Sequence, residues 1–250
     1  MLVGTGVAGG VVTAVVGGSS LITFPALLAA GLPPIVANAS NTVALTPGNF
    51  AAGLVDLERR PPWDRSFLGL IVVAIAGSAA GAALLLATPE KAFTALVPLL
   101  IGFATLLFAL SDRIRARLAR GGGRARGGGT SGAGPLLLFA PVAVYGGYFG
   151  AGMSVMILAL LSITLDADFR AVNVLKNLLS GLTSLVAVIV FVSQGVVAWL
   201  PTVVMMAGVL VGGVLGGRLV RVLPPPLLRG LVITVGAVLT AVYAWRYWGP

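Results

Sequence analysis

The chain alternates between long apolar segments and short stretches rich in charged residues, glycine and proline. Eight apolar segments result, at about 3–30, 34–55, 66–87, 92–110, 135–164, 169–194, 197–220 and 227–247. Most of them match the about 20 residues that a helix needs to cross a bilayer. The pattern therefore predicts an all-α membrane protein built from two sets of four segments.

The first segment of each set is too long for one crossing and is interrupted near its middle. Residues 17–20 (GGSS) interrupt the segment 3–30, and residues 150–152 (GAG) interrupt 135–164. The pieces on either side have roughly 15 and 11 residues, fewer than a membrane span requires. We therefore expect each opening segment to form a broken, re-entrant helical hairpin that returns to its own side. The alternative is that the glycines only allow close helix packing.

The distribution of basic residues supports the hairpins. With hairpins, each half keeps three transmembrane helices. Thirteen arginines then lie at or near one face against Lys91 and Arg246 on the other, with Lys176 left out as intramembrane. If both opening segments crossed fully, the division would be ten against five. Because basic residues concentrate in cytoplasmic loops, the more uneven division is favoured. Three crossings per half make residues 1–111 and 135–250 two inverted repeats, with both termini outside.

Between the two predicted repeats lies a strongly basic segment, residues 112–134. It contains RIRARLARGGGRARGGG, with six arginines and many glycines. Its glycine content predicts a flexible loop, and its charge places that loop in the cytoplasm. Binding to nucleic acid or to lipid headgroups is the alternative. Topology accounts for the net charge of +9 without a nucleic-acid partner.

Composition narrows the possible chemistry. Hydrophobic residues make up 58% of the 250 residues and charged residues 9%, against about 25% charged in soluble domains. The chain has no Cys and no His, which removes disulfides, thiolate nucleophiles, imidazole bases and most transition-metal sites. We therefore expect no enzyme, no catalytic residues, no metal ligands and no cofactor.

Two of the predicted helices carry a polar stripe at helical spacing. The stripe in 34–55 consists of Asn38, Asn41, Thr42 and Asn49. The stripe in 169–194 consists of Asn173, Lys176, Asn177, Ser180 and Ser184. Polar groups that face lipid would lack hydrogen-bond partners, so both stripes should face the bundle interior or a water-filled cavity. They could serve as a binding site, or only hold the helices together.

Lys176 is the strongest single candidate for ligand binding. A lysine inside a membrane costs a few kcal/mol, and no Asp or Glu lies within any predicted membrane segment to offset that cost. An anionic ligand would offset it. The alternative is that the ammonium reaches the cytoplasmic interface about two turns away, near Arg170.

The breaks in the two hairpins predict the same chemistry. Ser19 and Ser20 would open one half-helix, and Gly152 and Ser154 the other. Amides at helix N-termini bind anions, and broken helices of this kind form the substrate sites of many transporters. The full set of expected substrate-binding residues is Ser19, Ser20, Asn38, Asn41, Thr42, Gly152, Ser154, Asn173, Lys176, Asn177 and Ser180.

Two motifs carry a resemblance to a known family. GGSSLITFPALLAAGLPPIVANASNTVALTPG resembles the N-terminal signature of the sulfite exporter TauE/SafE family, and FGAGMSVM with NVLKN is similar to its second-half counterpart. The resemblance implies a bacterial inner-membrane transporter with duplicated halves that exports sulfite, sulfoacetate or related small anions. It assigns the site to Asn38, Asn41 and Thr42 in the first half and to Asn173, Lys176 and Asn177 in the second. Gly181 stands where some relatives carry a further polar residue.

We therefore expect a transporter that exports a small anion across the lipid bilayer by alternating access at a midplane site. Export of a monovalent anion from a negative cytoplasm gains about 2.3 kcal/mol per 100 mV, so uniport is the simplest mechanism. Proton coupling through carboxylates is disfavoured, because the predicted membrane segments contain no Asp, Glu or His. An anion channel and a membrane scaffold or assembly factor are the alternatives.

Overall fold

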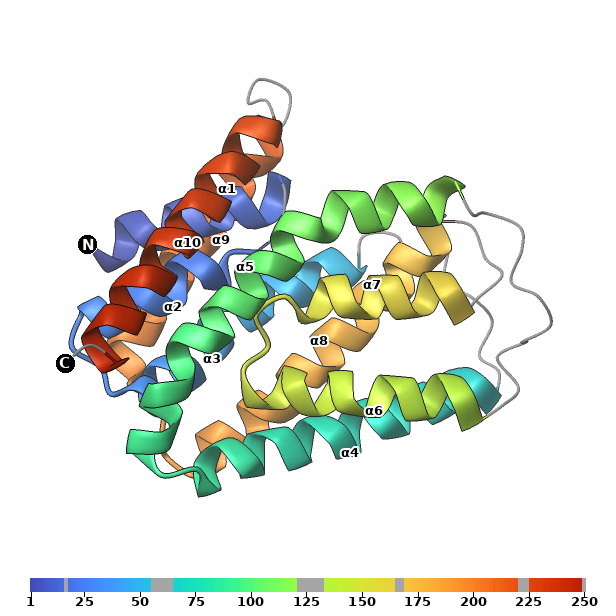
Figure 1. The fold of residues 1–250 in the computed structure, drawn as a ribbon, viewed down its shortest axis with the longest axis horizontal. Coiled ribbons are helices and arrows are strands. Elements are labelled where there is room, and N and C mark those ends of the chain that lie inside the picture. The colour runs from blue at the N-terminus through green and yellow to red at the C-terminus, as the bar shows by residue number, and fades with distance from the viewer. Residues whose placement is uncertain (16–17, 55–64, 121–132, 165–168, 220–224, 249–250) are drawn as a thin grey trace.

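The structure is a computed structural model that describes residues 1–15, 18–54, 65–120, 133–164, 169–219 and 225–248. These residues form ten α-helices and no strands (Figure 1). In the first half the helices are α1 (Leu2–Val15), α2 (Ser20–Ala29), α3 (Pro34–Leu54), α4 (Arg65–Ala87) and α5 (Glu90–Arg120). In the second half they are α6 (Ala133–Tyr148), α7 (Met153–Thr164), α8 (Phe169–Ser193), α9 (Trp199–Leu219) and α10 (Pro225–Trp248). The predicted all-α fold class is confirmed.

Both opening segments are broken where the sequence predicts. α1 and α2 have 14 and 10 residues, and α6 and α7 have 16 and 12. At about 1.5 Å per residue, none of the four reaches the roughly 30 Å of a bilayer core. Among the described residues, five other helices are long and apolar enough to cross a membrane, namely α4, α5, α8, α9 and α10.

The two halves interlock through their hairpins. α1 of the first half packs along α9 of the second, and α6 of the second half packs along α4 of the first. In Figure 1, α4 and α6 lie side by side along the lower edge of the molecule. α3 packs on α8, and α5 packs on α10. Exchanging the two halves therefore exchanges equivalent helix pairs, and the inverted repeat stays a prediction.

Glycines make the close packing of these helix pairs possible. A Cβ on Gly208 would lie 2.6 Å from the carbonyl oxygen of Val3, and a Cβ on Gly212 would meet the backbone of Val7. On the other pair, a Cβ on Gly81 would meet the backbone of Val144 in α6. Small residues that allow two backbones to approach are typical of helix association in membranes. These three glycines of α9 and α4 therefore allow the close approach of the paired helices.

α5 differs from its predicted boundary. It continues beyond residue 110 as far as Arg120, so the beginning of the predicted flexible loop 112–134 is helical. Arg, Leu and Ala are good helix formers, which explains the extension. Residues 121–132, with the glycine-rich part of that loop, lie outside the described residues.

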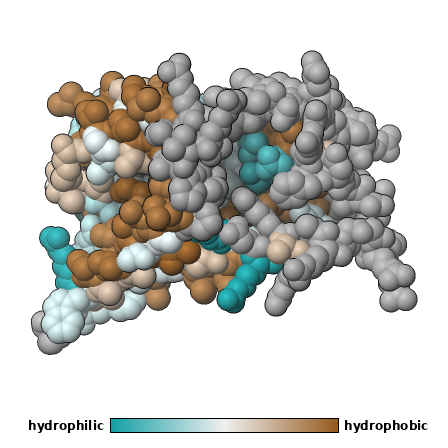
Figure 2. All heavy atoms as spheres, turned by 90° about the horizontal axis from the view of Figure 1, so that it is seen from above, coloured by the Kyte–Doolittle hydropathy of each residue, from teal (hydrophilic) through white to brown (hydrophobic). Residues whose placement is uncertain are grey.

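The outer surface of the bundle is apolar. Large hydrophobic side chains recur on exposed helix faces, including Leu68, Val72 and Ile75 on α4, Val203, Leu210 and Val214 on α9, and Leu231, Val238 and Val242 on α10. In Figure 2, apolar side chains cover much of the described surface at the left of the view. A surface of this kind is suited to contact with lipid.

Candidate substrate site

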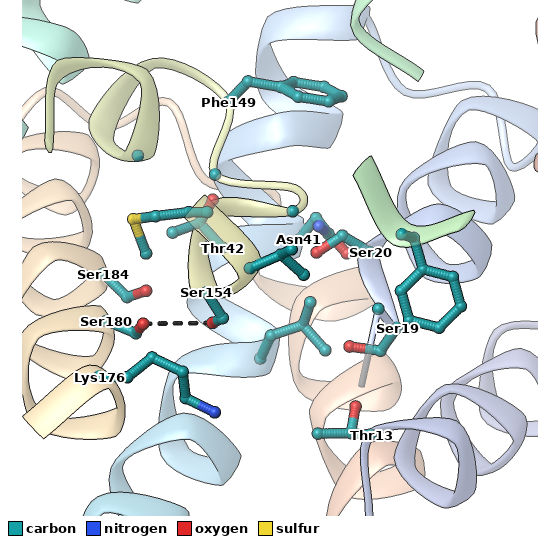
Figure 3. Close-up of a pocket in the computed structure, with 18 of the residues that line it drawn as sticks. Thr13, Ser19, Ser20, Asn41, Thr42, Phe149, Ser154, Lys176, Ser180 and Ser184 are labelled. Atoms are coloured by element: carbon teal, nitrogen blue, oxygen red, sulfur yellow. Dashed lines mark hydrogen bonds between the residues drawn. The ribbon is translucent and has the colours of Figure 1, made fainter. Parts of the chain in front are cut away.

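A cavity of about 190 Å³ lies where the two hairpin breaks, α3 and α8 meet. Figure 3 shows its labelled side chains converging from these elements. The volume is sufficient for a small solute together with several waters. Both halves of the chain therefore contribute to one polar chamber.

Most of the residues predicted to bind substrate line this cavity. They are Ser19, Ser20, Asn41, Thr42, Gly152, Ser154, Lys176, Asn177 and Ser180. Asn38 and Asn173 are not among the lining residues. Ser184, the last member of the second polar stripe, also lines it. The side chain of Asn49, on the first stripe, lies outside the described residues.

On α3, a hydrogen bond fixes the orientation of Asn41. The Oγ1 of Thr23, on α2, donates to the Oδ1 of Asn41 at 2.6 Å, in a buried contact. Because the side-chain oxygen is engaged by Thr23, the Asn41 amide can present its N–H groups to the cavity. An oriented amide of this kind is a suitable donor for an anionic oxygen.

Asn38, one turn before Asn41, has a different role. Its Nδ2 donates to the carbonyl oxygen of Tyr148 at 2.9 Å and so joins α3 to the end of α6. The Asn38 side chain is buried, and its Oδ1 has no hydrogen-bond partner. The contact links the two halves of the protein, which fits the interhelical role that the sequence left open for the asparagines.

On α8, Lys176 brings a positive charge to the cavity about two turns from the start of the helix. Its Nζ donates to the Oδ1 of Asn173 at 2.9 Å, so Asn173 supports the ammonium from outside the lining. One turn further along, the hydroxyls of Ser180 and Ser154 lie 3.2 Å apart and join α8 to α7 (Figure 3). Lys176 is the only charged residue among those that line the described cavity.

The two breaks bring the starts of half-helices to the cavity wall. Gly18 has φ +85° and Gly152 has φ +80°, a left-handed conformation that favours glycine. α2 begins at Ser20 and α7 at Met153, directly after these turns. The hydroxyl of Ser19 makes no capping hydrogen bond to α2, and Ser19 lines the cavity. The partial positive charge of two helix N-termini is therefore added to that of Lys176.

Sequence reasoning missed several residues of the wall. The polar ones are Thr13 in the last turn of α1 and Ser111 on α5. The apolar ones are Leu45, Phe108, Phe149, Met153 and Val155. Spacing gave no signal for Thr13 or Ser111, because each is an isolated polar residue at the end of an apolar run. The apolar residues could not be distinguished from core residues by type alone.

Comparison with known proteins agrees with this architecture. A family model described as "Sulfite exporter TauE/SafE" matches residues 2–243. The chain belongs to the sulfite exporter TauE/SafE family. The match covers both hairpins and all of the lining residues, so the resemblance seen in the two motifs extends over nearly the whole chain. The TauE/SafE family is one of membrane transporters.

Two relatives of this TauE/SafE member carry the same general description. A "Probable membrane transporter protein" of Haemophilus influenzae is 30% identical over 237 residues, which cover 92% of this chain and 88% of the relative. A "Probable membrane transporter protein" of Escherichia coli K12 is 27% identical over 237 residues, covering 93% and 84%. No solved structure matches the chain significantly. The protein is a multi-pass membrane transporter.

Proposed function

We propose that this TauE/SafE member exports a small anion from the bacterial cytoplasm by alternating access at the central cavity. The proposed substrate is a sulfur oxyanion or an organosulfonate, such as sulfite or sulfoacetate. Family membership and the chemistry of the residues that line the cavity together support this substrate class.

The observation that carries the proposal is the grouping of anion-binding features in one chamber. Lys176 contributes an ammonium, Asn41 and Asn177 contribute amides, and Ser20 and Met153 begin the two half-helices that start at the wall. Charge-assisted hydrogen bonds from such donors are roughly twice as strong as neutral ones. An oxyanion with three or four acceptor oxygens could engage donors from both halves at once.

The rest of the wall fits an anion that also has an apolar part. Leu45, Phe108 and Phe149 bring apolar side chains to the wall of the chamber. An organosulfonate could place its charged group near Lys176 and its carbon atoms against these side chains. Sulfite alone would occupy only part of the volume, together with water.

A binding screen tests the proposal. Purified protein is titrated calorimetrically with sulfite, sulfoacetate, taurine, sulfate, thiosulfate and small carboxylates. We expect saturable binding of at least one sulfur anion and weaker binding of zwitterionic taurine. Absence of binding for all of the anions would contradict the proposal.

A transport assay separates a carrier from a channel and from a scaffold. In proteoliposomes loaded with unlabelled anion, a carrier accumulates labelled anion by counterflow, whereas an open pore only equilibrates it. A scaffold produces no flux. We expect counterflow that saturates with anion concentration.

A further inference from the structure

The lining residues of the central cavity differ in exposure between its two ends. Ser154 is exposed, and Lys176 and Asn177 are partly exposed, so water reaches the cavity at the end where they lie. Phe149 lines the cavity and is 5% exposed. Figure 3 places Phe149 and Lys176 at opposite ends of the chamber. At the Phe149 end the wall is therefore formed by a buried aromatic side chain.

Two aromatic side chains from different hairpins meet at this end. Phe24 of α2 packs edge-to-face against Phe149, with 5.3 Å between the ring centroids. Phe24 is 1% exposed and does not line the cavity, so it forms a second layer behind Phe149. Because the two phenyl rings make only apolar and edge-to-face contacts, they can separate without breaking a hydrogen bond.

Tyr145 holds the backbone that carries Phe149. The carbonyl oxygen of Tyr145 accepts hydrogen bonds from the amides of Phe149 at 2.9 Å and Gly150 at 3.1 Å. Its hydroxyl donates to the carbonyl oxygen of Ala151 at 2.7 Å. One tyrosine thus binds three consecutive residues of the break. Its ring also packs edge-to-face against Phe103 of α5, with 5.6 Å between the ring centroids. This contact connects the break to the neighbouring helix.

We propose that Phe149 and Phe24 are the gate on the closed side of the cavity, and that Tyr145 is the positioning residue that keeps the gate shut. This inference rests on the proposed alternating access. When the gate opens, the two rings separate and the Tyr145 hydroxyl releases Ala151, so that the break can move with α7. The closed side is the one toward which Phe149 lies, away from the Lys176 end of the cavity.

The chain contains no Cys, so a single cysteine can report access to the cavity. Ser184→Cys places a thiol on the buried part of the cavity wall. Its reaction with a membrane-impermeant maleimide is timed in right-side-out and in inside-out vesicles. We expect the reaction from the side of the gate to be at least ~10-fold slower than the reaction from the other side. A separate variant, Ser193→Cys at the exposed end of α8, identifies which side of the membrane the gate faces.

Tyr145→Phe is the sharpest variant, because it keeps the ring and removes only the hydroxyl that binds Ala151. It should raise the slow-side rate by about three- to tenfold, as expected for the loss of one neutral hydrogen bond. Phe149→Ala should raise it at least as much, with Phe149→Leu as the milder alternative if Phe149→Ala folds poorly. Tyr247→Phe is the matched control, since Tyr247 stacks on Tyr243 in α10 and should leave the rate unchanged.

Two results would contradict the proposed gate. One is equal reaction of Ser184→Cys from both sides in the otherwise unaltered protein. The other is an unchanged slow-side rate in well-folded Tyr145→Phe and Phe149 variants alike. Both readouts are independent of any substrate, so a failure of the gate is distinguishable from a failure of anion binding in the calorimetric screen.

Discussion

Asn41 and Asn177 are the amides that line the cavity, one on each polar stripe. Replacing either by Leu removes donors to a charged acceptor, a loss of about 1.5–3 kcal/mol. We predict at least a roughly tenfold loss of anion affinity in Asn41→Leu and in Asn177→Leu, measured by calorimetry on folded protein.

Asn38→Leu is the matched control for that prediction. Asn38 bonds to the carbonyl oxygen of Tyr148 and does not line the cavity, so its replacement should lower thermal stability and leave affinity within about twofold. Normal affinity in Asn41→Leu and Asn177→Leu would assign both asparagines to helix packing instead.

Sequence alone located the polar residues that α3 and α8 bring to the cavity, because they repeat at helical spacing. Two stripes with the same spacing contain Asn41, Thr42, Lys176 and Asn177. Lipid offers no hydrogen-bond partners to such polar groups, so they must face the interior. Phe149 was beyond sequence reasoning for a physical reason. An aromatic residue in an apolar run looks the same whether it fills a core or ends a cavity, and only the packed structure distinguishes the two.

Among the elements, the breaks in the hairpins were predictable and the pairing of helices was not. Gly18 and Gly152 adopt positive φ directly before half-helices, as the glycine-rich breaks predict. That α1 would pack on α9, and α6 on α4, depends on contacts between residues far apart in the chain. Local patterns contain no information about such pairs, although the glycines indicated that some close pairing existed.

The α1–α9 contact provides a test at this scale. A side chain on Gly212 would meet the backbone of Val7, whereas a Cβ on Gly4, also in α1, would meet nothing within 4 Å. Overpacking costs about 1–3 kcal/mol. We predict that Gly212→Val lowers the melting temperature and the yield of monodisperse protein in detergent, while Gly4→Ala changes neither. Equal stability of the two variants would mean that the close approach of α1 and α9 contributes little to the stability of the folded protein.

For the whole molecule, the arrangement of the halves makes a prediction about sidedness. If the halves are inverted repeats, both termini lie outside and the central basic loop inside. Single cysteines at Ser131, Ser193 and Gly249 should then react with an impermeant reagent from inside at 131 and from outside at 193 and 249. Ser131 and Gly249 lie outside the described residues, so this experiment also locates them. Reaction of position 249 only from inside would refute the inverted arrangement.

The charge of Lys176 provides the most direct test of whether the cavity binds an anion. Affinity for the best sulfur anion from the binding screen is measured calorimetrically in the unaltered protein, in Lys176→Met and in Lys176→Arg. Lys176→Met keeps the length and the apolar stem but removes the charge, so we predict a roughly 10- to 100-fold loss of affinity. Lys176→Arg should retain binding with altered selectivity, because a planar guanidinium presents its donors differently from an ammonium. Undiminished binding by a well-folded Lys176→Met protein would contradict the role of Lys176 in anion binding and leave the half-helix N-termini as the anion-binding groups.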